Sequence, residues 1–205
     1  MSPPPSPSPD DPDVAAQGLP IAALRRFAAA RGACELCGRA VGDRHPHAAD
    51  VAGRTLRCCC TDCHGRLPAT EGPLRAVPDR VVSGTADEAA WDAVDAPVAL
   101  VFMLLDDHGH ATAFYPSPAG PTESLLPRAS WSTLMERVAL ATDLVPEVEA
   151  LLLDKRRRPV RAHIIPVDRC YELVGRLRRD WHGMDGGPVV DAALAEVLRD
   201  AEEAA

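Results

Sequence analysis

Two Cys-x-x-Cys pairs constrain the fold of this chain more than any other feature of its sequence. The first pair is Cys34 and Cys37, the second is Cys60 and Cys63, and 22 residues separate the two pairs. On a tight turn, this spacing directs both sulfurs of a pair at one ion, and Gly38 gives the backbone the freedom that such a turn needs. Two pairs supply the four thiolates of a closed, tetrahedral zinc site. The pattern therefore predicts a structural metal site in a small ribbon.

The surrounding residues leave alternatives for the ligands and for the metal. Cys58, Cys59 and Cys60 are consecutive, so Cys58, as the alternate ligand, or Cys59 could replace Cys60. Three histidines could also supply a nitrogen ligand: His45, His47 and His64. A rubredoxin-like iron centre has the same four-sulfur geometry, and an iron–sulfur cluster also uses four cysteines. Zn²⁺ is the predicted metal, and iron is the alternative.

The spacing between the pairs also predicts what lies between them. It exceeds the roughly 15–20 residues that are usual for this pattern, and a hairpin over residues 45–56 would account for the excess. Seven cysteines in a chain without a recognisable secretory signal after Met1 suit metal binding better than disulfides. No run of 18 apolar residues predicts a membrane span. We therefore expect a soluble, cytoplasmic protein.

The charge of the chain argues against a nucleic-acid partner. The formal net charge is -8, although residues 18–80 hold ten Arg and only six acidic residues. Four thiolates around a divalent metal would lower the charge of that segment by about 2, which leaves it near neutral. Residues 155–158 (Lys-Arg-Arg-Arg) could bind phosphate, but no interleaved aromatic residue accompanies them, and a solvated hairpin tip explains them better. A protein partner is the better expectation.

Three regions follow from the hydrophobic pattern. Residues 1–17 are rich in Pro, Ser and Asp and predict a disordered tail. Residues 18–80 predict a helix that begins at Pro20, followed by the zinc-ribbon-like module. Residues 81–205 predict an α+β domain. Its expected strands form a four-stranded, mostly antiparallel sheet with helices on one face, and Asp168 is expected to cap one of these helices. The predicted strands cover residues 98–105, 112–115, 148–154 and 161–165.

The candidates for other chemistry are weaker. The loop from Tyr115 to Ser124 is long and polar enough to line a site, and an enzyme would need a pocket that gathers Glu123, His163 and Tyr171. His163 alone reads as a satisfied core histidine, and Cys170 reads as a small buried residue. Residues 181–187 (Trp-His-Gly-Met-Asp-Gly-Gly) could form a contact surface, because Trp is favoured at interfaces.

Several stretches together resemble a bacterial family, the domain of unknown function numbered 5947. They are Leu24–Phe27, Cys34–Gly38, Cys58–Cys63, Tyr115–Gly120 with Thr122–Leu126, Val148–Leu152, Ile165–Asp168 with Cys170 and Tyr171, and Trp181–Gly187. The family's Cys-x-Cys-x-x-Cys pattern maps to Cys58, Cys60 and Cys63 and makes Cys59 the additional cysteine.

The resemblance also implies a context for the protein. Members of that family lie beside actinobacterial uptake [NiFe]-hydrogenase genes, which implies an accessory, maturation or electron-transfer-partner role. Our leading hypothesis is therefore a non-catalytic, zinc-binding accessory protein whose partner is a hydrogenase component. An iron-thiolate or iron–sulfur electron carrier is one alternative. A small enzyme that uses the Tyr115–Ser124 loop is the other.

Overall fold

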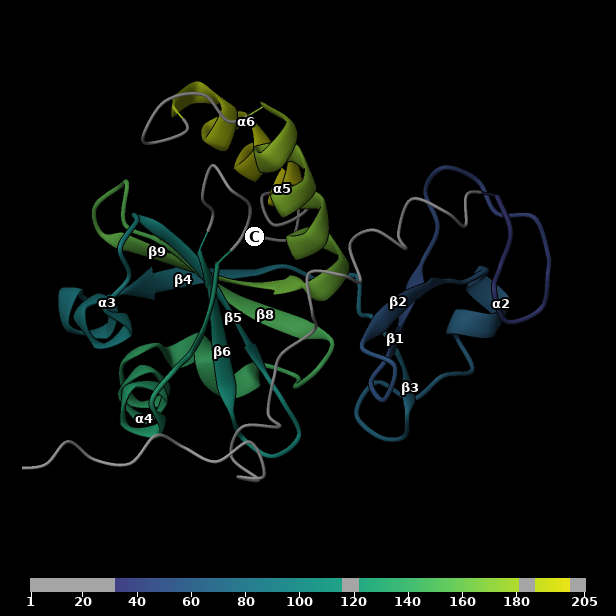
Figure 1. The fold of residues 1–205 in the computed structure, drawn as a ribbon, viewed down its shortest axis with the longest axis horizontal. Helices are drawn as coiled ribbons and strands as arrows, with labels where there is room; N and C mark the ends of the chain where they lie inside the picture. The colour runs from purple at the N-terminus through teal and green to yellow at the C-terminus, as the bar shows by residue number, and fades with distance from the viewer. Residues whose placement is uncertain (1–31, 116–121, 181–186, 200–205) are drawn as a thin grey trace, which may run out of the picture.

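The computed structural model describes residues 32–115, 122–180 and 187–199, which form a small three-stranded sheet and a larger six-stranded one (Figure 1). The predicted tail over residues 1–17 and the predicted helix from Pro20 lie outside the described residues. So do most of the loop between Tyr115 and Ser124 and nearly all of the Trp181–Gly187 segment. No helix among the described residues is long and apolar enough to cross a membrane.

The smaller sheet belongs to residues 32–80, which we call the ribbon. Its elements are β1 (His47–Asp50), β2 (Thr55–Cys58), the one-turn helix α2 (Thr61–His64) and β3 (Leu74–Ala76). The strand order is β2-β1-β3, and both pairings are antiparallel. The predicted hairpin over residues 45–56 is thus confirmed as β1 and β2, although β2 continues to Cys58. β3 was not predicted, because three residues in a turn-rich segment carry no periodic signal.

The larger sheet has six strands in the order β4-β9-β8-β5-β6-β7, and every neighbouring pair is antiparallel. The strands are β4 (Val82–Ala86), β5 (Leu100–Leu105), β6 (Ala111–Tyr115), β7 (Thr122–Leu125), β8 (Glu149–Asp154) and β9 (Val160–Pro166). The prediction of four strands was wrong, because it missed β4 and β7. These two form the edges of the sheet, and their mixed polar and apolar residues stay largely exposed or half-buried.

Helices cover both faces of the larger sheet, not one face as predicted. On one face lie α3 (Glu88–Val94), α4 (Arg128–Arg137) and the 3₁₀ helix η2 (Ala139–Asp143), and on the other lie α5 (Val167–Asp180) and α6 (Gly187–Val197) (Figure 1). The central strand β8 shows why. Leu151 and Leu153 pack into one core, whereas Ala150 and Leu152 pack into the other. A strand buried on both faces is apolar throughout and needs a cover on each side.

The ribbon packs against the side of the sheet that carries α5. Ala49 and Val77 of the ribbon are buried in the same hydrophobic cluster as Phe102 and Tyr171. Arg75, whose side chain is only 6% exposed, forms a two-pronged ion pair with Asp107 in the turn between β5 and β6. The ribbon and the sheet therefore share part of one core and a charge pair whose arginine is buried and whose aspartate is 41% exposed.

Candidate metal centre

The first cysteine pair lies on a tight turn at the start of the ribbon. The Cys34 N–H donates to the Arg39 carbonyl at 2.7 Å, and the Gly38 N–H donates to the Cys34 carbonyl at 2.8 Å. Gly38 has a φ of 75°, in the left-handed region that favours glycine. These hydrogen bonds curl the chain so that Cys34 and Cys37 face the same side, as their spacing predicts.

The second pair is placed by the start of a helix. Cys60 is the N-cap of α2, and Cys63 lies within this one-turn helix. The His64 N–H donates to the Cys60 carbonyl at 2.9 Å, which closes the turn and brings the sulfurs of Cys60 and Cys63 to one side. The β1–β2 hairpin carries the chain from the first pair to this helix, which accounts for the long separation between the pairs.

The structure brings the sulfurs of Cys34, Cys37, Cys60 and Cys63 together. All four Sγ atoms lie within 4.8 Å of one another, and those of Cys37 and Cys60 are 3.7 Å apart. Zinc–sulfur bonds of about 2.3 Å in a regular tetrahedron separate the sulfurs by about 3.8 Å. The four cysteines can therefore hold one metal ion. An iron–sulfur cluster fits less well, because it would spread the same sulfurs over more than one iron atom.

Backbone groups favour negative charge at this centre. Burial of the Cys34 thiol opposes its ionisation, but N–H groups of Cys60, Leu36 and Cys37 hydrogen-bond to its sulfur, and its pKa falls to about 6. Hydrogen bonds with the thiols of Cys37 and Cys60 raise the pKa of Cys63 to about 12. The surroundings therefore favour a thiolate at Cys34 and a protonated thiol at Cys63. A divalent cation would displace protons from its thiol ligands.

The two adjacent cysteines lie outside this group of four. Cys59 is fully buried and its thiol donates to the Arg57 carbonyl at 3.6 Å, while burial raises its pKa to about 11. Cys58 instead lies near His45 and His47, and the potential ligand atoms of these three residues are within 4.8 Å of one another. His64 is directed elsewhere, because its Nε2 lies 2.9 Å from the Val77 carbonyl oxygen.

The three residues of the proposed enzyme pocket do not all gather, because His163 lies far from Glu123. His163 and Glu123 belong to one row that crosses the sheet from β9 to β7, with Leu152, Phe102 and Phe114 between them. Four strand spacings separate the two residues by about 19 Å. His163 is buried on β9 and its Nδ1 lies 2.9 Å from the Ser83 hydroxyl, so the prediction of a satisfied core histidine is confirmed. Cys170 is buried in the core, also as predicted.

The basic segment over residues 155–158 is paired with acidic side chains. Arg156 makes two hydrogen bonds to Asp154, at 2.9 and 2.8 Å, and Lys155 lies 3.0 Å from Glu88. Arg158 also reaches Glu88, at 3.5 Å. Such pairing lowers the positive potential of the tip and fits a solvated hairpin better than a phosphate site.

Fold and site together define a class: an α+β protein with antiparallel sheets and a four-cysteine cluster able to hold a metal ion. Within that class, the chain belongs to the family described as "Family of unknown function (DUF5947)", which matches residues 33–205. The match covers nearly all of the described residues and includes both cysteine pairs. No curated protein and no solved structure matches the chain.

Proposed function

We propose that this protein is a non-catalytic accessory protein whose ribbon is held together by one Zn²⁺ on four thiolates and acts through contact with a partner protein. The observation that carries this proposal is the convergence of the four cysteine sulfurs within 4.8 Å on two tight turns. Four protein ligands complete the tetrahedron, so the ion has no open position for water or substrate. A closed metal site stabilises a fold, and its ion neither hydrolyses a substrate nor transfers a chemical group.

The ribbon needs such an ion more than the sheet does. Of its residues, only Ala49 and Val77 join the main hydrophobic core, with Leu56 packed at the edge. A segment of this size cannot offset its loss of conformational entropy with so little buried apolar surface. Thiolate ligation would supply the missing free energy. We also propose the cytoplasm, a reducing compartment, because the four converging cysteines must stay reduced to bind a metal ion.

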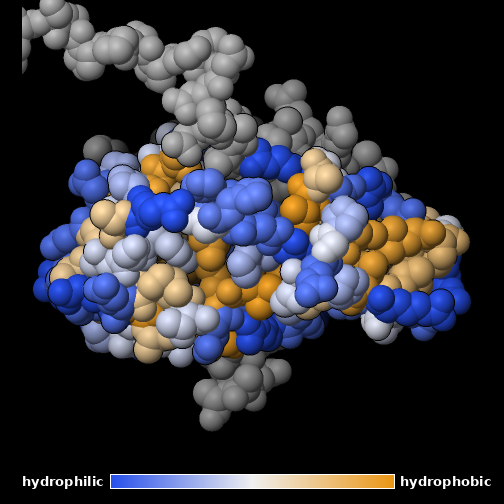
Figure 2. Space-filling model, turned by 90° about the horizontal axis from the view of Figure 1, so that it is seen from below, coloured by the Kyte–Doolittle hydropathy of each residue, from blue (hydrophilic) through white to orange (hydrophobic). Residues whose placement is uncertain are grey.

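A surface for a partner lies at the ribbon. Among the described residues, the large hydrophobic side chains that stay exposed are Leu36, at 38%, and Leu125, at 51%. Leu36 lies on the first cysteine turn, between two of the metal ligands, so the ion would fix its position. Figure 2 shows hydrophobic residues gathered at the ribbon end of the molecule. The family resemblance makes a [NiFe]-hydrogenase component the first partner to test.

The two exposed leucines form a matched pair for this test. Leu36→Glu should weaken binding of the chain to purified hydrogenase subunits at least tenfold, whereas Leu125→Glu on β7 should bind as the unmodified chain does. Isothermal titration calorimetry would measure both, with metal content checked in each variant. Equal binding by both variants, with metal retained, would contradict the ribbon as the contact surface.

A further inference from the structure

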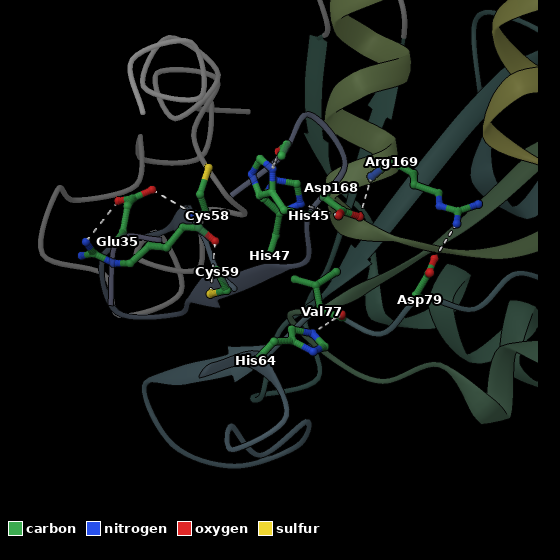
Figure 3. Close-up of polar contacts among 12 residues, drawn as sticks. Glu35, His45, His47, Cys58, Cys59, His64, Val77, Asp79, Asp168 and Arg169 are labelled. Carbon is green, nitrogen blue, oxygen red and sulfur yellow. Dashed lines mark hydrogen bonds and ion pairs between the residues drawn. The ribbon is translucent and has the colours of Figure 1, made fainter. Parts of the chain in front are cut away.

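The residues His45, His47 and Cys58 form a second group with ligand chemistry, separate from the four cysteines (Figure 3). The register of the hairpin explains why they meet. His47 on β1 lies directly opposite Cys58 on β2. His45 lies two residues before His47, just ahead of the strand, and the centroids of the two rings are 4.9 Å apart. The ligand atoms of the three residues lie within 4.8 Å of one another.

One ring nitrogen of His45, Nε2, is buried without a hydrogen-bond partner. The other, Nδ1, lies 2.7 Å from the Gly42 carbonyl oxygen. A buried polar atom without a partner is costly, because it has lost its hydrogen bonds to water. A metal ion beside Nε2 would remove that cost. The bond to Gly42 also fixes the ring in the tautomer that a metal needs, with the proton on Nδ1 and the lone pair on Nε2.

His47 is oriented by a carboxylate from the other part of the molecule. Its Nδ1 lies 2.8 Å from Asp168 Oδ2, and Asp168 belongs to the first turn of α5 (Figure 3). A carboxylate that receives the second ring N–H is the usual support of a metal-bound histidine, because it sets the tautomer and raises the basicity of the ligand nitrogen. Asp168 was expected to cap its helix, but α5 begins at Val167, so Asp168 lies within the first turn, where its other oxygen accepts the Arg169 N–H at 2.8 Å.

Hydrogen bonds with Glu35 hold Cys58 in place and connect it to the four-cysteine site. Its N–H donates to a Glu35 carboxylate oxygen at 2.9 Å, and its carbonyl accepts the Glu35 N–H at 2.8 Å. Glu35 lies between the ligands Cys34 and Cys37. The buried thiol of Cys58 therefore sits beside the four-cysteine centre without belonging to it.

We propose that His45, His47 and Cys58 form a second metal site, with two nitrogens and one sulfur for a borderline divalent ion such as Zn²⁺. Ligand bonds of about 2.0–2.3 Å would draw the three atoms to about 3.3–3.6 Å from one another. Small side-chain rotations achieve this from the separations in the structure. Three protein ligands leave the fourth position open for an exchangeable ligand, in contrast to the closed tetrathiolate.

A hollow borders this group on its His45 side. Its volume is about 340 Å³, and it is lined by Arg44, His45 and the ion pair between Arg39 and Asp62, but not by His47 or Cys58. Water or a small anion would fit there. Because Asp168 comes from α5, an ion at this site would also join the ribbon to the helical layer of the sheet domain.

The test is an anaerobic titration of the metal-free full chain with Co²⁺, whose visible spectrum reports the ligands. We expect two equivalents per chain. One should show the strong sulfur-to-cobalt absorption of a tetrathiolate, and the other should show weaker absorption from a single sulfur. Azide should shift the bands of the second ion and leave those of the first unchanged, because only the second has an exchangeable position.

Variants separate the two sites. His45→Ala should bind one equivalent and keep the tetrathiolate spectrum, and Cys58→Ala should do the same. His64→Ala is the matched control and should bind two. Asp168→Asn leaves all ligands in place and should weaken the second equivalent by about 10–100-fold. The proposal would be overturned if the unmodified chain bound only one Co²⁺, or if His45→Ala still bound two. Loss of the tetrathiolate spectrum from both His45→Ala and Cys58→Ala would also overturn it.

Discussion

The ribbon and the six-stranded sheet are stabilised in different ways. Every residue of β8 in the sheet is buried, and a hydrophobic cluster fills each face. The ribbon has strands of three or four residues, and its only fully buried side chains near the cysteines are small ones such as Ala48 and Cys59. The sheet draws its stability from apolar burial, whereas under the proposed function the ribbon would draw its stability from ligation of its cysteines.

This difference assigns separate roles to the two regions. A sheet that folds through its own cores can act as a stable base, and a metal-dependent ribbon can present residues in a fixed arrangement on it. The two regions meet at the Arg75–Asp107 ion pair and at the His47–Asp168 contact. The following changes should affect one region and spare the other if this comparison is correct.

Replacing one cysteine of the four should have the largest effect. Cys34→Ser should abolish the tetrathiolate metal site and unfold the ribbon, because a buried ligand is lost and little else holds that segment. Limited proteolysis followed by mass spectrometry should show rapid cleavage within residues 32–80 and protection of the sheet. Cys59→Ala is the control and should keep its metal, with a loss of about 1 kcal/mol for the small buried volume removed. Equal metal loss in both variants would show that the ligands are assigned wrongly.

A core substitution in the sheet should lower the stability of the protein and leave its metal content unchanged. Leu152 is fully buried in the cluster that α5 and α6 cover, and Leu152→Ala should lower the free energy of unfolding by about 2–5 kcal/mol. Chemical denaturation would measure the loss. Metal content of the folded protein should not change. Loss of metal together with stability would mean that the ribbon depends on the sheet for its fold.

The charge pair between the regions should have an intermediate and pH-dependent effect. Hydrogen bonds from Arg75 lower the pKa of Asp107 from its ordinary value of 3.8, so the folded state favours the charged carboxylate. This contribution is fully present above the unfolded pKa and disappears as the pH falls through the lower, folded pKa. Asp107→Asn should therefore destabilise the protein at neutral pH, by no more than about 1 kcal/mol, because the Asp107 side chain is 41% exposed and solvent screens the pair. Thermal unfolding at a series of pH values should show the two proteins converging in acid. A constant difference at every pH would exclude this account of the pair.

An exposed ion pair of the ribbon should matter least. Arg39 and Asp62 form a bridge with side chains 63% and 60% exposed. Solvent screens such a pair, so Arg39→Gln should leave metal content and the unfolding midpoint unchanged within error. Elemental analysis and thermal melts at low and high salt would test this. A marked loss of metal would show that the pair positions Cys60 and Cys63 through α2.

The features that could be predicted from the sequence, the cysteine cluster and the central strands, are those with strong local patterns. Two Cys-x-x-Cys pairs specify a four-sulfur cluster whatever the rest of the chain does, and the continuous apolar runs of β5 and β8 mark central strands. The edge strands β4 and β7 were not predicted, because an edge strand buries few side chains and therefore lacks an apolar pattern. The second helical layer was missed for a related reason, since a continuous apolar run does not reveal by itself how many of its faces are covered.

The second group of ligands required information that no local pattern holds. The His-x-His spacing keeps His45 and His47 close in the chain, and their ring centroids lie 4.9 Å apart, although β1 begins only at His47. Their meeting with Cys58 depends on the register of the hairpin, which its turn sets. The left-handed φ of 51° in that turn falls on Arg54 and not on the adjacent Gly53, which the sequence would have favoured for it. Asp168 comes from 121 residues further along the chain, so only the tertiary structure brings it to His47.

Metal analysis of the chain with only the four-cysteine site intact tests the central claim most directly. The double variant His45→Ala, Cys58→Ala, purified without oxygen, would be analysed for metal content and for its visible spectrum. We predict one zinc per chain and no colour. Iron with sulfur-to-metal absorption would contradict the claim and would identify an electron carrier instead of a structural site.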